Sequence, residues 1–138
     1  MIAAIRPRRA AARRLVHLGE DGQSTVELAL ALPFVALMLL AVVQVGLVVR
    51  DQILVVHAAR EAARAAAVHA EADPVEAAAV HGSGLSAVRL VVERGERGPP
   101  GSIVAVTVRY RSATEVPLVG ALVADVDLSA RAAMRVEG

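Results

Sequence analysis

The chain has 138 residues, a formal net charge of +1 at pH 7 and a hydrophobic content of 56%. This hydrophobicity excludes an intrinsically disordered protein, and the small net charge argues against a surface that binds nucleic acid over its whole extent. There is no Cys and no Trp, and only one Phe and one Tyr. Disulfide scaffolds, thiolate metal sites and cysteine nucleophiles are therefore excluded, and platforms that stack bases are disfavoured.

The first 22 residues are basic. They carry five arginines among Ala and Leu: Arg6, Arg8, Arg9, Arg13 and Arg14. Arginines beside a membrane span remain on the cytoplasmic side, so we expect residues 1–22 to form a basic cytoplasmic leader and these arginines to set the topology. Contact with nucleic acid is the less economical explanation, because no aromatic residues accompany the arginines.

The strongest signal is an apolar run, residues 28–49, in which no side chain is ionisable and Gln44 is the one strongly polar residue. A helix of that length covers roughly 33 Å, close to the hydrocarbon core of a bilayer at about 30 Å. The run predicts a transmembrane helix over residues 23–49, in contact with the lipid bilayer. A buried core helix is the alternative, but the remaining chain offers little apolar material to surround it. A cleaved secretory signal is disfavoured because the run is too long and ends in Arg-Asp-Gln.

The flanking charges predict the orientation. Five arginines precede the run, whereas three follow it closely, at Arg50, Arg60 and Arg64. The positive-inside rule then places the N-terminus in the cytoplasm and the C-terminal part outside it, in a protein that crosses the cytoplasmic membrane once.

Helical sequence continues beyond the apolar run. Residues 50–72 are rich in Ala, the best helix former, so we expect a single helix over about 24–71 whose second part is an extracytoplasmic extension. Asp73 as N-cap and Pro74 at the first position predict a second, short helix. Gly-Ser-Gly at 82–84 is expected to end it.

The last third of the chain alternates between apolar and polar residues. Segments 86–94, 102–112 and 128–137 have the period of two that is typical of strands with one buried face, and Val88 is assigned to that face in the first segment. Residues 95–101 are expected to form a hairpin loop, and 114–127 a connection with a helical turn. The predicted fold class is α+β: a long N-terminal helix with a three-stranded antiparallel sheet packed on its C-terminal half. Residues 73–138 would form a small extracytoplasmic domain.

The junction between leader and apolar run carries the motif that indicates a function. Gly22 ends the leader, Gln23, Ser24, Thr25 and Val26 follow, and Glu27 stands at the edge of the apolar helix. This arrangement resembles the processing site of precursors of type IV pilin-like proteins. The longer stretch GQSTVELALALPFVALMLL, followed by AAREAARAAA, resembles the TadE-like family of minor pseudopilins from tight-adherence (Tad/Flp) pilus systems. The resemblance is close over about residues 19–70.

The resemblance implies a processing event and a set of partners. A prepilin peptidase would cut between Gly22 and Gln23 on the cytoplasmic face, so that Glu27 becomes the fifth residue of the mature chain. In pilin-like families this glutamate aligns a subunit with the N-terminal amine of its neighbour. The implied function is a structural and assembly component of the pilus or a related secretion apparatus. The implied partners are the peptidase, other pilins or pseudopilins and the inner-membrane assembly platform, with an additional location in a surface pilus.

Ser24 and Glu27 also have a purely structural explanation. Ser-x-x-Glu is a capping box, and an acid near a helix N-terminus interacts well with the helix dipole. Cleavage would create an α-amine that is largely cationic at neutral pH, and a carboxylate at a lipid boundary is costly unless a cation pairs with it. The two roles of Glu27 are compatible.

Other constellations carry less weight. His57, His69 and His81 are twelve residues apart, a spacing that does not match a compact metal site. The sequence also shows no nucleophile–base pair and no phosphate-binding loop, and its arginine cluster lacks aromatic residues. We expect no metal, no cofactor, no nucleic-acid partner and no enzymatic activity. The alternative function is an uncleaved single-pass membrane protein with an extracytoplasmic partner-binding domain. A tethered hydrolase ranks last because no catalytic set is recognisable.

Overall fold

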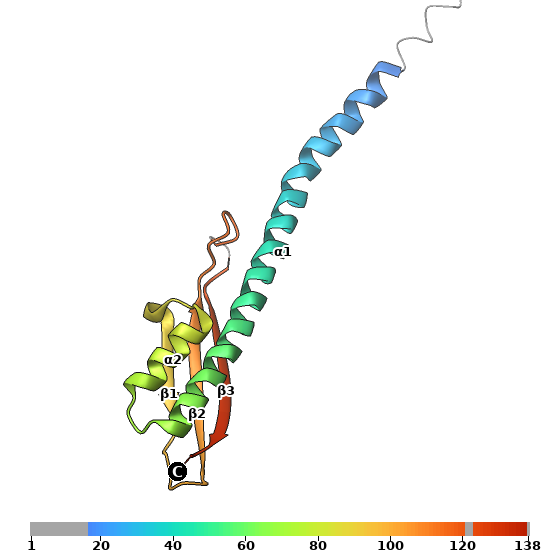
Figure 1. The fold of residues 1–138 in the computed structure, drawn as a ribbon. Coiled ribbons are helices and arrows are strands. Elements are labelled where there is room, and N and C mark those ends of the chain that lie inside the picture. The colour runs from blue at the N-terminus through green and yellow to red at the C-terminus, as the bar shows by residue number, and fades with distance from the viewer. Residues whose placement is uncertain (1–16, 121–122, 138) are drawn as a thin grey trace, which may run out of the picture. The chain divides into compact units, whose positions relative to one another are not determined.

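We describe the protein from a computed structural model, which defines residues 17–120 and 123–137 (Figure 1). Its elements are α1 (His17–Val68), α2 (Asp73–Ser83), the 3₁₀ turn η1 (Ala87–Arg89), β1 (Leu90–Arg94), β2 (Ile103–Ser112) and β3 (Val126–Arg135). The α+β fold with a long N-terminal helix and an antiparallel sheet of three strands is confirmed. The described residues divide into two units, of which the first ends at Leu39 and the second begins at Leu40.

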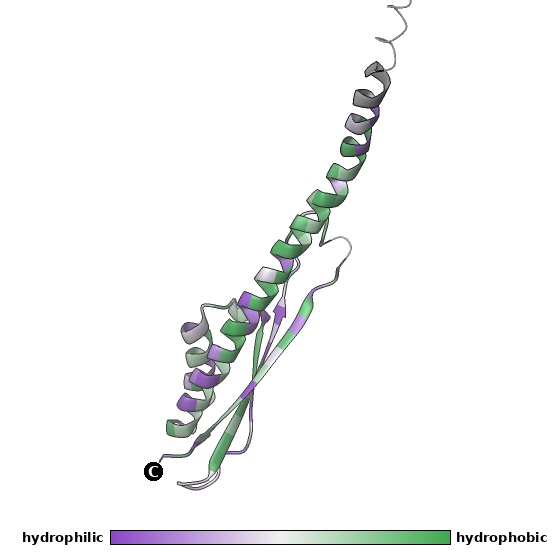
Figure 2. Cartoon of the chain, turned by 90° about the vertical axis from the view of Figure 1, so that its right-hand side faces the viewer, coloured by the Kyte–Doolittle hydropathy of each residue, from purple (hydrophilic) through white to green (hydrophobic). Residues whose placement is uncertain are grey.

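In the first unit, the described side chains belong to α1 and are almost all exposed. Phe34 is 74% exposed and Met38 72%, and Leu37 is the one side chain between residues 22 and 39 that is half-buried. Figure 2 shows this part of α1 mostly in the green of hydrophobic residues, apart from its upper end. The alternative of a buried core helix is therefore wrong for this segment, because its apolar side chains find no cover within the described chain.

The sheet of the second unit has the strand order β1-β2-β3, with both pairs antiparallel. Val106 in the central strand lies opposite Arg94 of β1 and Ala132 of β3. Alternation along β2 is regular: Val104, Val106 and Val108 are fully buried, whereas the residues between them are more exposed. The predicted buried face of the central strand is therefore confirmed, and it is apolar because one side of the sheet is covered by helices.

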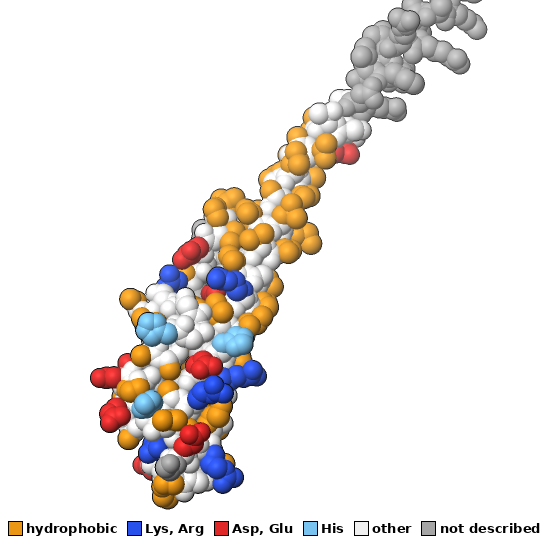
Figure 3. All heavy atoms as spheres, viewed as in Figure 1, with side chains coloured by type: hydrophobic (Ala, Val, Ile, Leu, Met, Phe, Trp, Pro, Cys, Tyr) orange, Lys and Arg blue, Asp and Glu red, His pale blue; other side chains and the backbone are white. Residues whose placement is uncertain are grey.

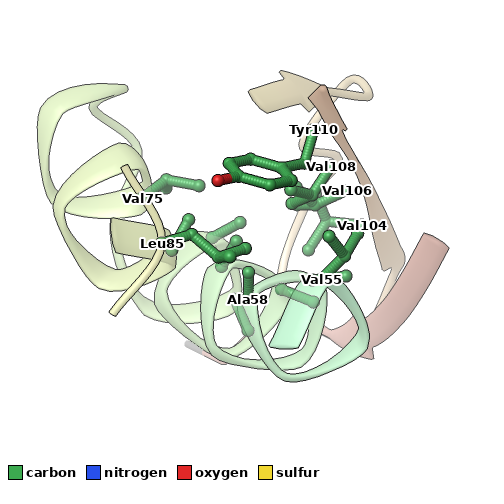
Figure 4. Close-up of a cluster of buried hydrophobic side chains, with 14 of the residues drawn as sticks. Val55, Ala58, Val75, Leu85, Val104, Val106, Val108 and Tyr110 are labelled. Carbon is green, nitrogen blue, oxygen red and sulfur yellow. The ribbon is translucent and has the colours of Figure 1, made fainter. Parts of the chain in front are cut away.

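The cover on that side comes from the second half of α1 and from α2. Their buried side chains point toward the buried face of β2 and toward Tyr110 (Figure 4). Small side chains let the backbone of α1 approach its neighbours closely. A Cβ added to Gly82 of α2 would lie only 2.8 Å from Cγ of Glu61, so α2 is also in close contact with α1. From residue 50 onward, the buried positions of α1 are Val55 and then six alanines, which we call the alanine face: Ala58, Ala59, Ala62, Ala63, Ala66 and Ala67.

The C-terminal end of α1 is bonded by the β1–β2 loop. Arg97 donates from Nε to the carbonyl of Ala66 (3.2 Å) and from Nη2 to that of Ala67 (3.1 Å). The backbone N–H of Glu137 donates to the same Ala67 carbonyl. The last carbonyls of a helix have no partner inside it and carry partial negative charge, so a guanidinium is well suited to this position. These bonds attach both the loop and the end of the chain to α1.

Two predictions of local structure are wrong. Asp73 is the first residue of α2 and not its N-cap: the carbonyl of Ala72 accepts the N–H groups of Val75 and Glu76, and no side chain caps this end. Val88, predicted to lie on a buried strand face, is 95% exposed, because residues 87–89 form η1 and the strand begins only at Leu90. The end of α2 is as predicted, with Gly84 in the left-handed conformation at φ 67°.

The alanine face predicts a sharp difference between two alanines of α1. Ala62 is fully buried, whereas Ala41 is exposed. Ala62→Leu forces three extra carbons into a packed layer and should lower the free energy of unfolding by about 1–3 kcal/mol. Ala41→Leu should change it by less than about 0.5 kcal/mol. Urea unfolding in detergent micelles, followed by the fluorescence of the single tyrosine, Tyr110, measures both. Equal midpoints for the two variants would contradict the close packing of this face.

Candidate functional site

The predicted processing junction lies within α1. A Cβ added to Gly22 would meet no atom within 4 Å, and its φ is not in the left-handed region. Neither packing nor backbone conformation in the described structure therefore requires a glycine here. Glycine inside a helix costs roughly 0.5–1 kcal/mol relative to alanine. The fold gives no reason for this residue, which leaves room for a functional one.

Gln23 and Glu27 lie on one face of the helix, one turn apart. The side-chain amide of Gln23 donates to Oε1 of Glu27 at 3.4 Å, and both side chains are exposed. Among the described residues, the Glu27 carboxylate accepts a hydrogen bond from this neutral amide and pairs with no cation. The carboxylate thus remains accessible to a positive group from outside the chain.

Other predicted site residues are placed differently. Because α1 begins at His17, Ser24 lies seven residues inside the helix and not at its start. Its capping role stays a prediction for a chain that begins at Gln23. The topogenic arginines Arg6, Arg8, Arg9, Arg13 and Arg14 lie outside the described residues, and their role also stays a prediction.

The apolar run presents its side chains outward along α1, as the orange surface of Figure 3 shows. Val42, for example, is 62% exposed and Leu39 63%. Within the described residues, Gly22–Val68 is the one helix long and apolar enough to cross a membrane, and only 6% of its most apolar window is buried in the protein. Exposed apolar surface of this length is unfavourable in water, so the helix is compatible with insertion as a single span.

Gln44 departs from this pattern. It is 5% exposed, whereas its neighbours Val43 and Val45 are 54% and 62% exposed. Neither polar atom of its amide has a hydrogen-bond partner in the described structure. Sequence reasoning identified Gln44 as the polar residue of the run but not its burial. The spacing of Gln44 from Val48 and Val55 could have predicted this burial. It places the three residues on one face of the helix, which continues toward the alanines.

The face of the sheet away from the helices has no catalytic or metal-binding arrangement among the described residues. It has a shallow hollow of about 810 Å³, bordered by the ion-paired Arg111 and Asp127 (3.2 Å). Nearby, Arg109 pairs with Glu93 at 3.3 Å. These four side chains form ion pairs at an open surface, and none of them is a nucleophile paired with a base. In the described ranges, no three His, Asp or Glu side chains come close enough to hold a metal ion.

Comparison with known families agrees with the helical part of this description. Residues 22–64 match the family model described as TadE-like protein. This segment of the chain is TadE-like. The TadE-like segment begins at Gly22, includes Glu27 and the whole apolar run, and ends within the alanine face. No curated protein and no solved structure matched the chain.

Proposed function

We propose that the chain is a pseudopilin: a non-enzymatic structural and assembly component of a Tad/Flp-type pilus or a related secretion apparatus. It would be made as a precursor with a cytoplasmic N-terminus and one membrane span. The observation that carries this proposal is the TadE-like segment, residues 22–64. It starts at a glycine that packing among the described residues does not require, and it continues through the exposed apolar run.

The first step is hydrolysis of the peptide bond between Gly22 and Gln23 by a prepilin peptidase. Water adds across the bond, leaving a carboxylate on Gly22 and an α-amine on Gln23. In the described structure this bond lies inside a helix, so the helix has to open locally before a protease can reach the carbonyl. Glycine lowers the cost of opening and, having no side chain, lets the backbone approach the protease closely.

The second step is assembly through α1. The exposed apolar side chains would exchange lipid for the helices of neighbouring subunits. Glu27 is costly in apolar surroundings unless a cation pairs with it, and the new amine of a neighbouring subunit would provide that cation. Glu27 is exposed and, among the described residues, is bonded to the neutral Gln23 amide and to no cation, which supports its availability for this pairing.

Gly22→Ala tests the processing step. The extra methyl group stabilises the local helix by about 1 kcal/mol, which corresponds to about a fivefold slower cleavage when the helix must open first. Crowding in the protease cleft should slow it further. Cleavage is measured as the ratio of precursor to mature chain on gels after co-expression with a prepilin peptidase. Gly46→Ala is the matched control, since this helical glycine also has open space around its Cβ position. Equal cleavage of both variants would contradict the role of Gly22.

Substitutions at Glu27 separate pairing from capping. A capping box accepts Glu or Gln, whereas pairing with an amine requires the charge. Glu27→Gln should be cleaved normally, yet its cross-linking to neighbouring pilin subunits should fall about tenfold, equivalent to about 1.4 kcal/mol of lost association energy. Glu27→Ala should lose at least as much. If Glu27→Gln assembles like the parent while Glu27→Ala does not, the residue acts as a cap and the pairing step is wrong.

A further inference from the structure

The connection between β2 and β3 has an unusual composition. Between Glu115 and Asp125 the sequence contains no charged residue, and most of it is aliphatic. We use the term apolar loop for its described part, residues 116–120 and Val123. Val116 and Val119 are each 7% exposed, whereas Leu118 is 64% and Val123 47% exposed. The loop therefore buries one set of aliphatic side chains and presents another outward.

The apolar loop has a defined structure of its own. At its base, the backbone N–H of Thr114 donates to Oδ1 of Asp125 (3.2 Å), and the Thr114 hydroxyl donates to the carbonyl of Ala124 (3.1 Å). Gly120 folds back so tightly that a Cβ on it would lie 2.5 Å from the Thr114 carbonyl oxygen. Leu118 has φ 67°, a left-handed conformation that costs roughly 1–2 kcal/mol for a residue with a side chain. A strained backbone that presents a leucine to the exterior suggests a function for that side chain.

The position of the loop indicates what it meets. It belongs to the same compact unit as residues 40–49, the last part of the apolar run. The loop lies beside α1 and beyond the end of the sheet both in Figure 1, where this part of the helix is teal, and in the turned view of Figure 2. Gln44, in this stretch, is 5% exposed, so α1 is in part covered at this level. Gln44 precedes Val49, the end of the run, by five residues, or roughly 8 Å along a helix.

We propose that the apolar loop inserts into the extracytoplasmic interface of the bilayer, as a second membrane contact beside the spanning helix. Apolar protein surfaces that lie in this interface are buried by about 5–10 Å, which matches the depth of Gln44. The charges at the base, Glu115 with its partner Arg89 (3.4 Å), would then lie at the level of the headgroups. This inference rests on the proposed insertion of α1.

The absence of tryptophan from the chain makes a direct test possible. Leu118→Trp places a single tryptophan on an exposed position of the loop. The full chain is reconstituted into phosphatidylcholine vesicles whose acyl chains are brominated either near the headgroup or near the chain end. We expect a blue-shifted emission, with quenching by the shallow bromines at least about twofold stronger than by the deep ones, as for a residue at the interface.

Two further variants with one tryptophan each serve as controls. Ile103 is 69% exposed and lies at the opposite end of β2, about 30 Å from the loop by strand length, so the indole of Ile103→Trp should not be quenched. Met38→Trp reports on the apolar run of α1 and should be quenched by the deep bromines.

The three variants separate failure of the inference from failure of the proposed function. If Met38→Trp is quenched but Leu118→Trp emits as in water, the loop does not enter the bilayer and the inference is overturned, whereas the spanning helix stands. The same holds if Leu118→Trp and Ile103→Trp are quenched equally, because the contact is then not specific to the loop. If Met38→Trp itself is not quenched, α1 does not span the membrane and both proposals fall.

Discussion

The size of the side chains on α1 is the constraint on which the rest of the structure depends. Along the apolar run the helix carries Leu, Val, Phe and Met, which are largely exposed. After Val55 its buried positions are all alanine. Large apolar side chains are favourable where a helix meets lipid, whereas small ones are needed where a sheet and a second helix approach closely. One continuous helix thus changes from a surface suited to a membrane to a surface suited to a packed core.

This change also explains how a chain with almost no aromatic residues forms a core. The layer between helices and sheet is thin, built from alanines on α1 and valines on β2, with Tyr110 as its one large ring. Such a layer tolerates little added volume. Stability at its edges comes from polar contacts, among them Arg97 on the last carbonyls of α1 and the hydrogen bond of Ser112 to Asp51 at 2.7 Å.

Periodicity made much of this architecture predictable. The apolar run, the alanine-rich extension and the alternation of β2 are local patterns, and each predicted the element that forms. Features that depend on contacts far apart in the sequence were not predictable. The sequence shows Arg97 only as one residue of a turn-rich loop, whereas the fold brings it to the carbonyl of Ala66. It shows Gln44 only as a polar residue in an apolar run, whereas the fold buries it. Val88 fits the alternating pattern of a strand, but residues 87–89 form a 3₁₀ turn instead.

The same distinction applies to function. The motif from Gly22 to Glu27 could be identified from sequence because it is short and contiguous, and the structure adds that Gly22 has no packing role among the described residues. The most direct test of the account is the intact mass of the protein purified from native membranes. We predict a chain that begins at Gln23, or that mass less one ammonia if the terminal glutamine has cyclised. A chain that still carries Arg6–Arg14 would contradict the pseudopilin account and leave an uncleaved membrane anchor.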